Sequence, residues 1–312
     1  MQESRAGKVR GAPVGALVFL MGWGGVACAH VGEVGEARVT WLSWNADWWL
    51  WFLITLSGWL YARGVRRLWQ AAGANAGVSA VHVAAFVAGW LSLVVALLSP
   101  LDAISADLFS AHMVQHELLM IVAAPLLMIG RPLGPYAWAL PKGWRHPAAL
   151  LIRELGIPVA VHALTRPVPA WIVGLIALWI WHVPALFDAA LRSETIHTLQ
   201  HLTFFLSALL FWWSLVRIRR GEKSYGIAVL SVITTGLHAS LLGALLTFAG
   251  SVWYRAYAAR ALAWGLTPLE DQQLGGLIMW IPGGLVYLIA VLALMALWLQ
   301  TPGPAGRATP AR

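Results

Sequence analysis

The sequence predicts an all-α fold, a polytopic membrane bundle of about seven transmembrane helices. Three observations predict it. Of the 312 residues, 60% are hydrophobic and only 11% are charged, whereas soluble domains carry about 25% charged residues. The apolar residues also fall into stretches that approach the roughly 20 residues a helix needs to cross a bilayer. No stretch alternates as the strands of a barrel would, so helices are the structure that satisfies the backbone in lipid.

The chain begins with a segment typical of a secretory signal peptide. Three basic residues precede a short apolar core and a small-x-small site, in the order Arg5, Lys8, Arg10, residues 12–26 and Ala27-Cys28-Ala29. We therefore expect residues 1–29 to be a signal peptide, whose cleavage leaves His30 as the new amino terminus. Without cleavage the segment is an eighth membrane helix. Cys28 is the single cysteine of the chain, which excludes an internal disulfide and a cysteine-only metal cage.

Residues 30–47 are expected to form an extracytoplasmic segment, and residues 48–299 the transmembrane domain. Seven apolar stretches follow one another there, at residues 48–62, 78–99, 113–130, 168–183, 202–216, 226–249 and 276–299. The longest connection, residues 131–167, has room for a short amphipathic helix around residues 146–155. Residues 300–312, rich in Pro, Gly and Ala, are expected to be a disordered cytoplasmic tail.

Basic residues set the expected orientation. With these spans, 17 of the 21 Lys and Arg residues fall on one side of the membrane, the side that the positive-inside rule assigns to the cytoplasm. The mature amino terminus should therefore lie outside and the carboxyl terminus inside. The net charge of +8 is then a topology signal, and nucleic acid is not an expected partner.

Two copies of one histidine pattern stand at the outer ends of two predicted spans. They are His112-Met113-Val114-Gln115-His116 and His197-Thr198-Leu199-Gln200-His201. A spacing of four puts both imidazoles of a pair on one helical face, about 6 Å apart along the axis. Because ionisable groups at membrane depth are rare without a function, the two pairs predict a metal or cofactor site.

Two further histidines lie near this level. His182 closes the fourth predicted span at the same face, and His238 lies about 17 Å below the outer end of the sixth. Taken alone, His182 fits an interfacial hydrogen-bonding residue, and His238 equally well fits a polar contact between buried helices.

The ligand types favour copper. A zinc protease motif requires Glu after the first histidine, and the chain has Met113 and Thr198 there. Imidazole with thioether groups and no thiolate suits copper in either oxidation state. Gln115 and Gln200 are candidates for orienting the imidazoles. A haem between His116 and His201 is the main alternative, since helix bundles can supply two facing imidazoles.

Longer motifs surround these histidines. They are His112-Met113-Val114-Gln115-His116-Glu117-Leu118-Leu119-Met120 with Ala124-Pro125-Leu126-Leu127 and Gly130-Arg131-Pro132, then Trp181-His182-Val183-Pro184-Ala185-Leu186-Phe187-Asp188, then Asp271-Gln272-Gln273-Leu274-Gly275-Gly276-Leu277-Ile278-Met279-Trp280-Ile281-Pro282. In type and order they resemble the multi-pass CtaG family of cytochrome c oxidase assembly proteins, from about residue 48 to residue 299. The last motif is the most specific. The resemblance implies a bacterial plasma-membrane protein that helps deliver copper to a haem-copper oxidase.

The resemblance thus implies an assembly factor, and the expected topology places its metal site toward the periplasm or the cell exterior. The ligands that the resemblance and the ligand chemistry together imply are His112, His116, His182, His197, His201, His238, Asp271 and Met113. Expected partners are copper, cytochrome c oxidase subunits and the lipid bilayer. We do not expect an enzyme, because no nucleophile, activated base or phosphate loop stands out. The alternatives are a haem-binding redox subunit, a copper transporter with His238 on its route, and a structural scaffold.

Overall fold

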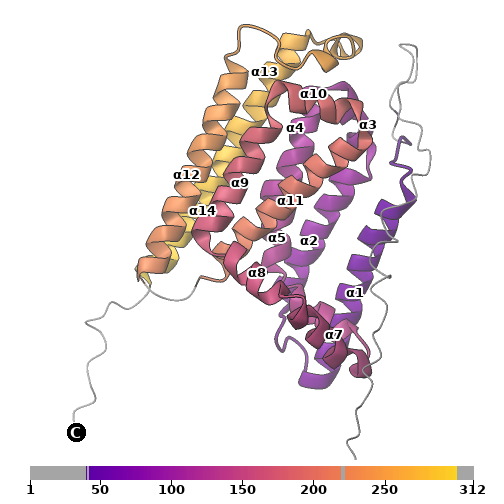
Figure 1. The fold of residues 1–312 in the computed structure, drawn as a ribbon, viewed down its shortest axis with the longest axis vertical. Helices are drawn as coiled ribbons and strands as arrows, with labels where there is room; N and C mark the ends of the chain where they lie inside the picture. Colours follow the sequence, from indigo (N-terminus) through magenta and orange to yellow (C-terminus); the bar gives the residue numbers. More distant parts are fainter. Residues whose placement is uncertain (1–39, 41, 219–221, 301–312) are drawn as a thin grey trace, which may run out of the picture. The chain divides into compact units, whose positions relative to one another are not determined.

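A computed structural model describes Thr40 and residues 42–218 and 222–300, without the side chains of residues 222–224. The predicted signal peptide, most of the predicted extracytoplasmic segment and nearly all of the predicted tail lie outside these residues. Within the described part of the chain, all regular structure is helical (Figure 1). This confirms the predicted fold class.

Fourteen α-helices and four short helical turns follow one another in the described residues. In order they are α1 (Trp48–Ala72), α2 (Ala80–Leu97), α3 (Pro100–Asp107), α4 (Phe109–Glu117), η2 (Leu118–Ala123), α5 (Ala124–Ile129), α6 (Leu133–Ala139), α7 (Lys142–Glu154), α8 (Ile157–Leu164), α9 (Pro167–Trp181), α10 (Pro184–Arg192), α11 (Glu194–Val216), α12 (Glu222–Thr247), η3 (Arg255–Tyr257), η4 (Ala261–Trp264), α13 (Pro268–Ile278), η5 (Met279–Gly283) and α14 (Gly284–Leu299). The turns η2 and η5 are π-helical, whereas η3 and η4 are 3₁₀ turns.

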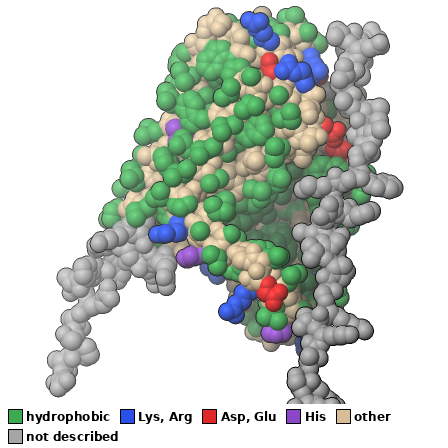
Figure 2. All heavy atoms as spheres, viewed as in Figure 1, with side chains coloured by type: hydrophobic (Ala, Val, Ile, Leu, Met, Phe, Trp, Pro, Cys, Tyr) green, Lys and Arg blue, Asp and Glu red, His purple; other side chains and the backbone are tan. Residues whose placement is uncertain are grey.

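Five helical stretches are long and apolar enough to cross a membrane: Ala80–Leu97, Phe109–Ile129, Glu194–Val216, Tyr225–Thr247 and Pro268–Leu299. The number rises to seven if each of two bent helix pairs counts as one span. One pair is α9 with α10, bent by 76°, and the other is α7 with α8, bent by 64°. Hydrophobic side chains cover the middle of the visible face, and charged side chains gather near its two ends (Figure 2), as a bilayer requires.

The spans differ from the prediction in two places. Helix α1, predicted to span at residues 48–62, continues for 25 residues and is not one of the five stretches. Its second half carries Arg63, Arg66 and Arg67, which lower its hydropathy. Residues 131–167, predicted to be a loop with one short helix, contain α6, α7 and α8. The bend between α7 and α8 falls at Gly156, whose φ of 66° favours glycine.

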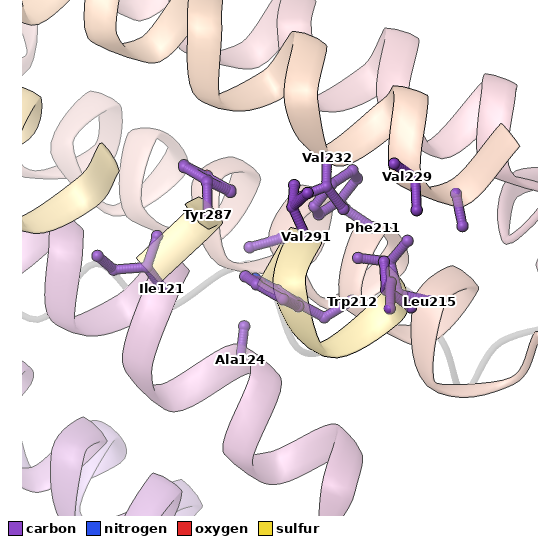
Figure 3. Close-up of a cluster of buried hydrophobic side chains, with 12 residues drawn as sticks. Ile121, Ala124, Phe211, Trp212, Leu215, Val229, Val232, Tyr287 and Val291 are labelled. Carbon is purple, nitrogen blue, oxygen red and sulfur yellow. The ribbon is translucent and has the colours of Figure 1, made fainter. Parts of the chain in front are cut away.

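One buried cluster joins α11, α12 and α14 to η2 and α5 (Figure 3). At its centre Trp212 stacks parallel to Tyr287, with ring centroids 6.2 Å apart. The Trp212 indole N–H also donates to the carbonyl of Met120 over 2.9 Å. Because lipid tails are as apolar as these side chains, such packing and hydrogen bonding hold membrane helices together.

The end of the bundle that carries α3 and α10 lies opposite the end that carries α7 and α8 (Figure 1). Small residues bring α13 close to its neighbours there. A Cβ on Gly276 would stand 2.6 Å from the backbone nitrogen of Thr247 in α12, and a Cβ on Gly275 would overlap the Phe109 ring in α4. These two glycines therefore allow α13 to pack directly against α12 and α4, and α4 carries the first histidine pair.

Candidate metal centre

The structure brings the two histidine pairs together at the α3 and α10 end of the bundle. Helix α4 carries His112 and His116, and α11 carries His197 and His201. One ring nitrogen from each of His112, His116 and His201 lies within 4.8 Å of the other two. The His197 ring has its centroid 4.2 Å from that of His201 and 5.2 Å from that of His112. Four imidazoles from two helices thus share one small volume.

His182 supplies a fifth imidazole from the bend between α9 and α10. Its Nδ1 lies 2.7 Å from the carbonyl oxygen of Leu178. A carbonyl only accepts, so Nδ1 carries the proton and Nε2 presents a lone pair. That Nε2 atom is buried and has no hydrogen-bond partner among the described residues. The centroid of the His182 ring lies 6.1 Å from that of Phe187 and 6.0 Å from that of Phe204. The same two rings pack against His112 and His116, so His182 belongs to the same centre.

His238 lies apart from this cluster. It stands nine residues before the end of α12, about 14 Å along the helix axis, with its ring centroid 6.3 Å from that of Trp171. A second buried polar group, Glu117, follows His116. Its Oε2 is 3.0 Å from where a Cβ on Gly283 would stand, and it has no partner among the described residues. The sequence predicts that His238 lies beneath the other histidines and binds the same ion. In the structure its ring packs against Trp171, and no ring contact joins it to a clustered imidazole in the described part of the chain, which does not favour His238 as a ligand of that ion.

Aromatic side chains close the centre. His112 is fully buried and His116 is 3% exposed. Phe187 of α10 packs 5.2 Å from the His112 ring, and Phe204 of α11 packs 4.7 Å from the His116 ring, measured between centroids. The segment between α12 and α13, which we call the covering segment, lies over the centre and contributes Tyr257, which is 2% exposed. The rings of His112 and His116 are therefore shielded from water and from lipid, whereas His197 and His201 are partly exposed.

Tyr257 also determines which nitrogen of His112 can bind a metal. The Tyr257 hydroxyl donates to the carbonyl of Ser105 over 3.0 Å, so it accepts from His112 Nδ1, 2.8 Å away. Burial raises the pKa of Tyr257 well above its usual value, which keeps the hydroxyl protonated. The proton of His112 then sits on Nδ1, and its Nε2 lone pair points at Nε2 of His116 over 2.8 Å. His116 supplies the proton of that bond.

The donor set fits a metal ion with imidazole ligands. A first-row metal holds imidazole nitrogen at about 2.0 Å, which places tetrahedral neighbours roughly 3.3 Å apart. The Nε2 atoms of His112 and His116 are 2.8 Å apart, close to that spacing. The buried Nε2 atoms of His182, His197 and His201 have no hydrogen-bond partner in the described part of the chain. One ring nitrogen from each of His112, His116 and His201 lies close enough to the other two for small ring rotations to bring all three onto one ion.

Asp271 has contacts that favour a positioning role over ligation. Its Oδ2 accepts from the backbone N–H of Phe109 over 2.7 Å, and its Oδ1 accepts from the N–H and hydroxyl of Ser110 over 3.0 and 2.6 Å. Phe109 and Ser110 open α4. The carboxylate therefore caps the helix that carries His112 and His116, where backbone N–H groups lack partners and negative charge is favoured.

Gln272 and Gln273 hold the segment that covers the centre. Gln272 Oε1 accepts from the N–H of Trp253 over 2.6 Å, and its Nε2 donates to the carbonyl of Ser251 over 3.2 Å. Gln273 donates to the carbonyl of Ala249 over 3.1 Å. The side chains of the third sequence motif thus fasten both α4 and the covering segment to α13.

Met113 and Gln115 face away from the imidazoles. Met113 is fully buried on the α13 side of α4, with its Cγ 3.2 Å from where a Cβ on Gly275 would stand. Gln115 is also fully buried, and its Nε2 donates to the carbonyl of Ala96 over 2.7 Å and to Asp102 over 2.9 Å. These contacts give Met113 a packing role and Gln115 a role in tying α4 to α2 and α3.

Sequence reasoning missed Tyr257 and Tyr254, and it named Phe187 only as part of the second motif. Tyr254 donates to the carbonyl of His182 over 3.0 Å and stacks on Phe109, with centroids 4.7 Å apart. The available signal was a pair of tyrosines three residues apart in an outer connection. That signal is weak by itself, because tyrosine is common at membrane interfaces.

The comparisons with known proteins agree with the motifs. The family model for the cytochrome c oxidase caa3 assembly factor matches residues 59–301, which include all five clustered histidines. Uncharacterized proteins of Mycobacterium bovis and Mycobacterium tuberculosis are each 27% identical over 229 residues, 69% of this chain and 34% of theirs. One of Mycobacterium leprae is 26% identical over 233 residues, 70% of this chain and 34% of its own.

The chain therefore spans about a third of the length of these curated relatives. No solved structure matches it at a significant level. The family match covers well over half of the 312 residues and contains the three motifs that build the histidine centre. The chain belongs to the caa3 assembly factor family of cytochrome c oxidase.

Proposed function

We propose that this protein holds copper at its histidine centre, on the extracytoplasmic side of the bacterial plasma membrane, and delivers it to subunits of cytochrome c oxidase. The observation that carries the proposal is the cluster of imidazoles in which one buried ring nitrogen each of His116, His182, His197 and His201 has no hydrogen-bond partner among the described residues. Family membership supports the assembly role. The role is non-catalytic, because copper is cargo here and no bond of a substrate needs to be broken.

The chemistry of the centre suits copper better than other common ions. Neutral imidazoles without carboxylate or thiolate partners fit copper, whereas magnesium and calcium require oxygen ligands. His112, with its proton fixed on Nδ1, presents Nε2 without rearrangement. For copper to bind between His112 and His116, the Nε2 of His116 must lose its proton. The Nδ1 of the same ring can accept that proton, because it is buried and has no partner among the described residues.

Delivery requires the cover to open. Tyr254 and Tyr257 hold the segment between α12 and α13 over the centre through hydrogen bonds to His182 and His112. Copper could leave by ligand exchange once these two bonds break. We propose that docking of an oxidase subunit on this end of the bundle exchanges the cover for the subunit's own ligands.

Haem is a weaker alternative on this geometry. The His116 and His201 rings have centroids 5.1 Å apart. The His112 ring packs against both, at 4.3 and 5.6 Å, where a macrocycle between them would have to pass. A Soret band in the purified protein would nevertheless favour haem. Copper transport is a further alternative, because the unpartnered His238 lies deeper in the bundle, and copper flux in proteoliposomes would reveal it.

The proposal is tested in cells that lack the chain and are complemented with variants. His116→Ala combined with His201→Ala should leave the oxidase polypeptide present but deficient in copper, with added copper restoring part of the activity. His162→Ala, an exposed histidine of α8, is the matched control and should behave as wild type. Immunoblotting must show equal amounts of each variant. Normal copper content in oxidase from the double variant would contradict the proposal.

A further inference from the structure

A second candidate site lies at the opposite end of the bundle. A cavity of about 430 Å³ opens where α5 turns into α6 and where α11 ends. Arg217, which lines it, follows His201 by 16 residues, about 24 Å along the helix axis. Two arginines, Arg131 and Arg217, line this cavity together with the indoles of Trp138 and Trp213 and apolar side chains such as Met128 and Leu133.

Arg131 stands at the cavity in a backbone conformation that favours glycine. Its φ is 51°, in the left-handed region that costs free energy for a residue with a Cβ. Its neighbours impose this turn. The carbonyl of Gly130 accepts from the Tyr61 hydroxyl over 2.8 Å, a Cβ on Gly130 would stand 2.6 Å from the Cβ of Phe86, and Pro132 leads into α6. Glycine would avoid the strain at this position, so the presence of arginine indicates that its side chain has a function.

Neither cavity arginine has an acceptor for its guanidinium N–H groups among the described residues. The Arg217 guanidinium stacks over the Trp213 ring, 4.4 Å from the centroid, which leaves its N–H edge open. The described residues give no side-chain hydrogen bond or ion pair for the guanidinium of Arg131 or Arg217, and none of the described residues that line the cavity is acidic. By contrast, Arg67 and Arg145 on this end of the bundle donate to backbone carbonyls.

We propose that this cavity binds the phosphate group of an anionic phospholipid. Two guanidinium groups can each offer paired N–H donors to phosphate oxygens. The apolar wall and the two indoles suit the glycerol and the first methylenes of an acyl chain. Basic pockets between helices on the cytoplasmic side of a membrane are suited to such headgroups. This inference is independent of copper and of the proposed delivery function.

General charge asymmetry does not account for this arrangement. The positive-inside rule needs exposed basic residues somewhere on this side, and Arg153 on α7 meets that need as well as the exposed Arg131 and Arg217 do. It does not need an arginine in a left-handed turn, nor two arginines that converge on one cavity. A lipid phosphate accounts for both features.

Delipidated full-length protein in neutral detergent provides the test, with bound lipid counted by native mass spectrometry. Phosphatidylglycerol should bind about thirtyfold more tightly than phosphatidylcholine, the preference expected for two arginines near a phosphate. Arg131→Gly should lose about fivefold to tenfold of that preference, and it should melt at the same or a higher temperature because glycine relieves the strained φ. Arg131→Gly combined with Arg217→Gln should abolish the preference, whereas Arg153→Gln should retain it.

Equal binding of the two lipids by the wild-type protein would overturn the proposal. So would an unchanged preference in the double variant. Inorganic phosphate is the second arm of the experiment. If millimolar phosphate displaced phosphatidylglycerol from the wild-type protein, the site would serve a soluble phosphate ligand and the lipid proposal would be wrong.

Discussion

Single protons decide how the histidine centre can bind an ion. His112 keeps its proton on Nδ1 because Tyr257 must accept from it while donating to Ser105. His182 keeps its proton on Nδ1 because Leu178 offers only a carbonyl. Both rings therefore present Nε2 lone pairs before any metal arrives. Such outer partners fix the tautomer and the ring angle of a ligand histidine, and losing one costs metal affinity.

Tyr257→Phe removes the hydroxyl and keeps the ring. We expect copper affinity to fall about 10- to 100-fold, because the His112 tautomer and ring angle are no longer fixed. The folded protein should lose roughly 1–3 kcal/mol, since the Ser105 carbonyl and His112 Nδ1 lose a buried partner. Competition titration against a copper chelator measures the first effect and thermal unfolding the second. Tyr225→Phe, a buried tyrosine at the start of α12, is the control, and equal copper affinity in both variants would contradict the role of Tyr257.

Asp102 should make stability depend on pH. Burial is the main cause of the raised pKa of this carboxyl, partly offset by hydrogen bonds from Gln115 and Asn45. A group whose pKa is higher in the folded state contributes stability that is fully present below its unfolded pKa, near 4, and is lost as pH rises through its folded pKa. Thermal melts from about pH 4 upward should therefore show a decline that Asp102→Asn removes. An identical decline in the variant would assign it to other groups.

At the scale of elements, α13 is the part that holds the centre together. It caps α4 through Asp271, accommodates Phe109 at Gly275, and fastens the covering segment through Gln272. None of these contacts reaches an imidazole. The motif around Asp271 therefore supports the helix that carries His112 and His116, although the two segments are more than 150 residues apart in the sequence.

Asp271→Asn tests this support. An amide keeps the shape but loses the charge that faces the first N–H groups of α4, so we expect a loss of roughly 1–2 kcal/mol in stability. Copper affinity should fall with it, while the number of imidazole ligands stays unchanged. Glu154→Gln, an exposed residue of α7, should change neither quantity. Loss of a ligand from the copper spectrum of Asp271→Asn would show instead that the carboxylate itself binds the metal.

Some of this centre could be predicted from the sequence and some could not. A histidine spacing of four maps directly onto one helical face, so the two pairs were recognisable before their helices were placed. Tyr257 and Phe187 reach His112 only because two outer segments fold across the end of the bundle. Asp271 is predicted as a metal ligand, because a sequence pattern cannot distinguish a ligand carboxylate from one that caps another helix.

At the scale of the whole molecule, the two proposed sites lie at opposite ends of the helical bundle. The histidine end is predicted to face outward and the arginine cavity inward. The fold class follows from composition because only helices satisfy their own backbone in lipid. The number of spans was harder to predict, because it depends on whether each of the two bent pairs, α7 with α8 and α9 with α10, counts as one span.

Orientation can be checked with single cysteines in a Cys28→Ser background. Glu194→Cys, exposed at the start of α11, should react with a membrane-impermeant maleimide in intact spheroplasts. Arg153→Cys, exposed on α7, should react only after the membrane is permeabilised. The reverse pattern would place the histidine centre on the cytoplasmic side and remove it from the route proposed for copper.

The most direct measurement of the central claim is X-ray absorption spectroscopy of the copper-loaded protein. The account predicts one copper per chain with three or four imidazole nitrogens at about 2.0 Å and no sulfur ligand, since Met113 faces α13. The combined His112→Ala and His201→Ala variant should lose this signal. A sulfur shell, a single imidazole, or an unchanged spectrum in that variant would contradict the claim that these five histidines form a copper centre.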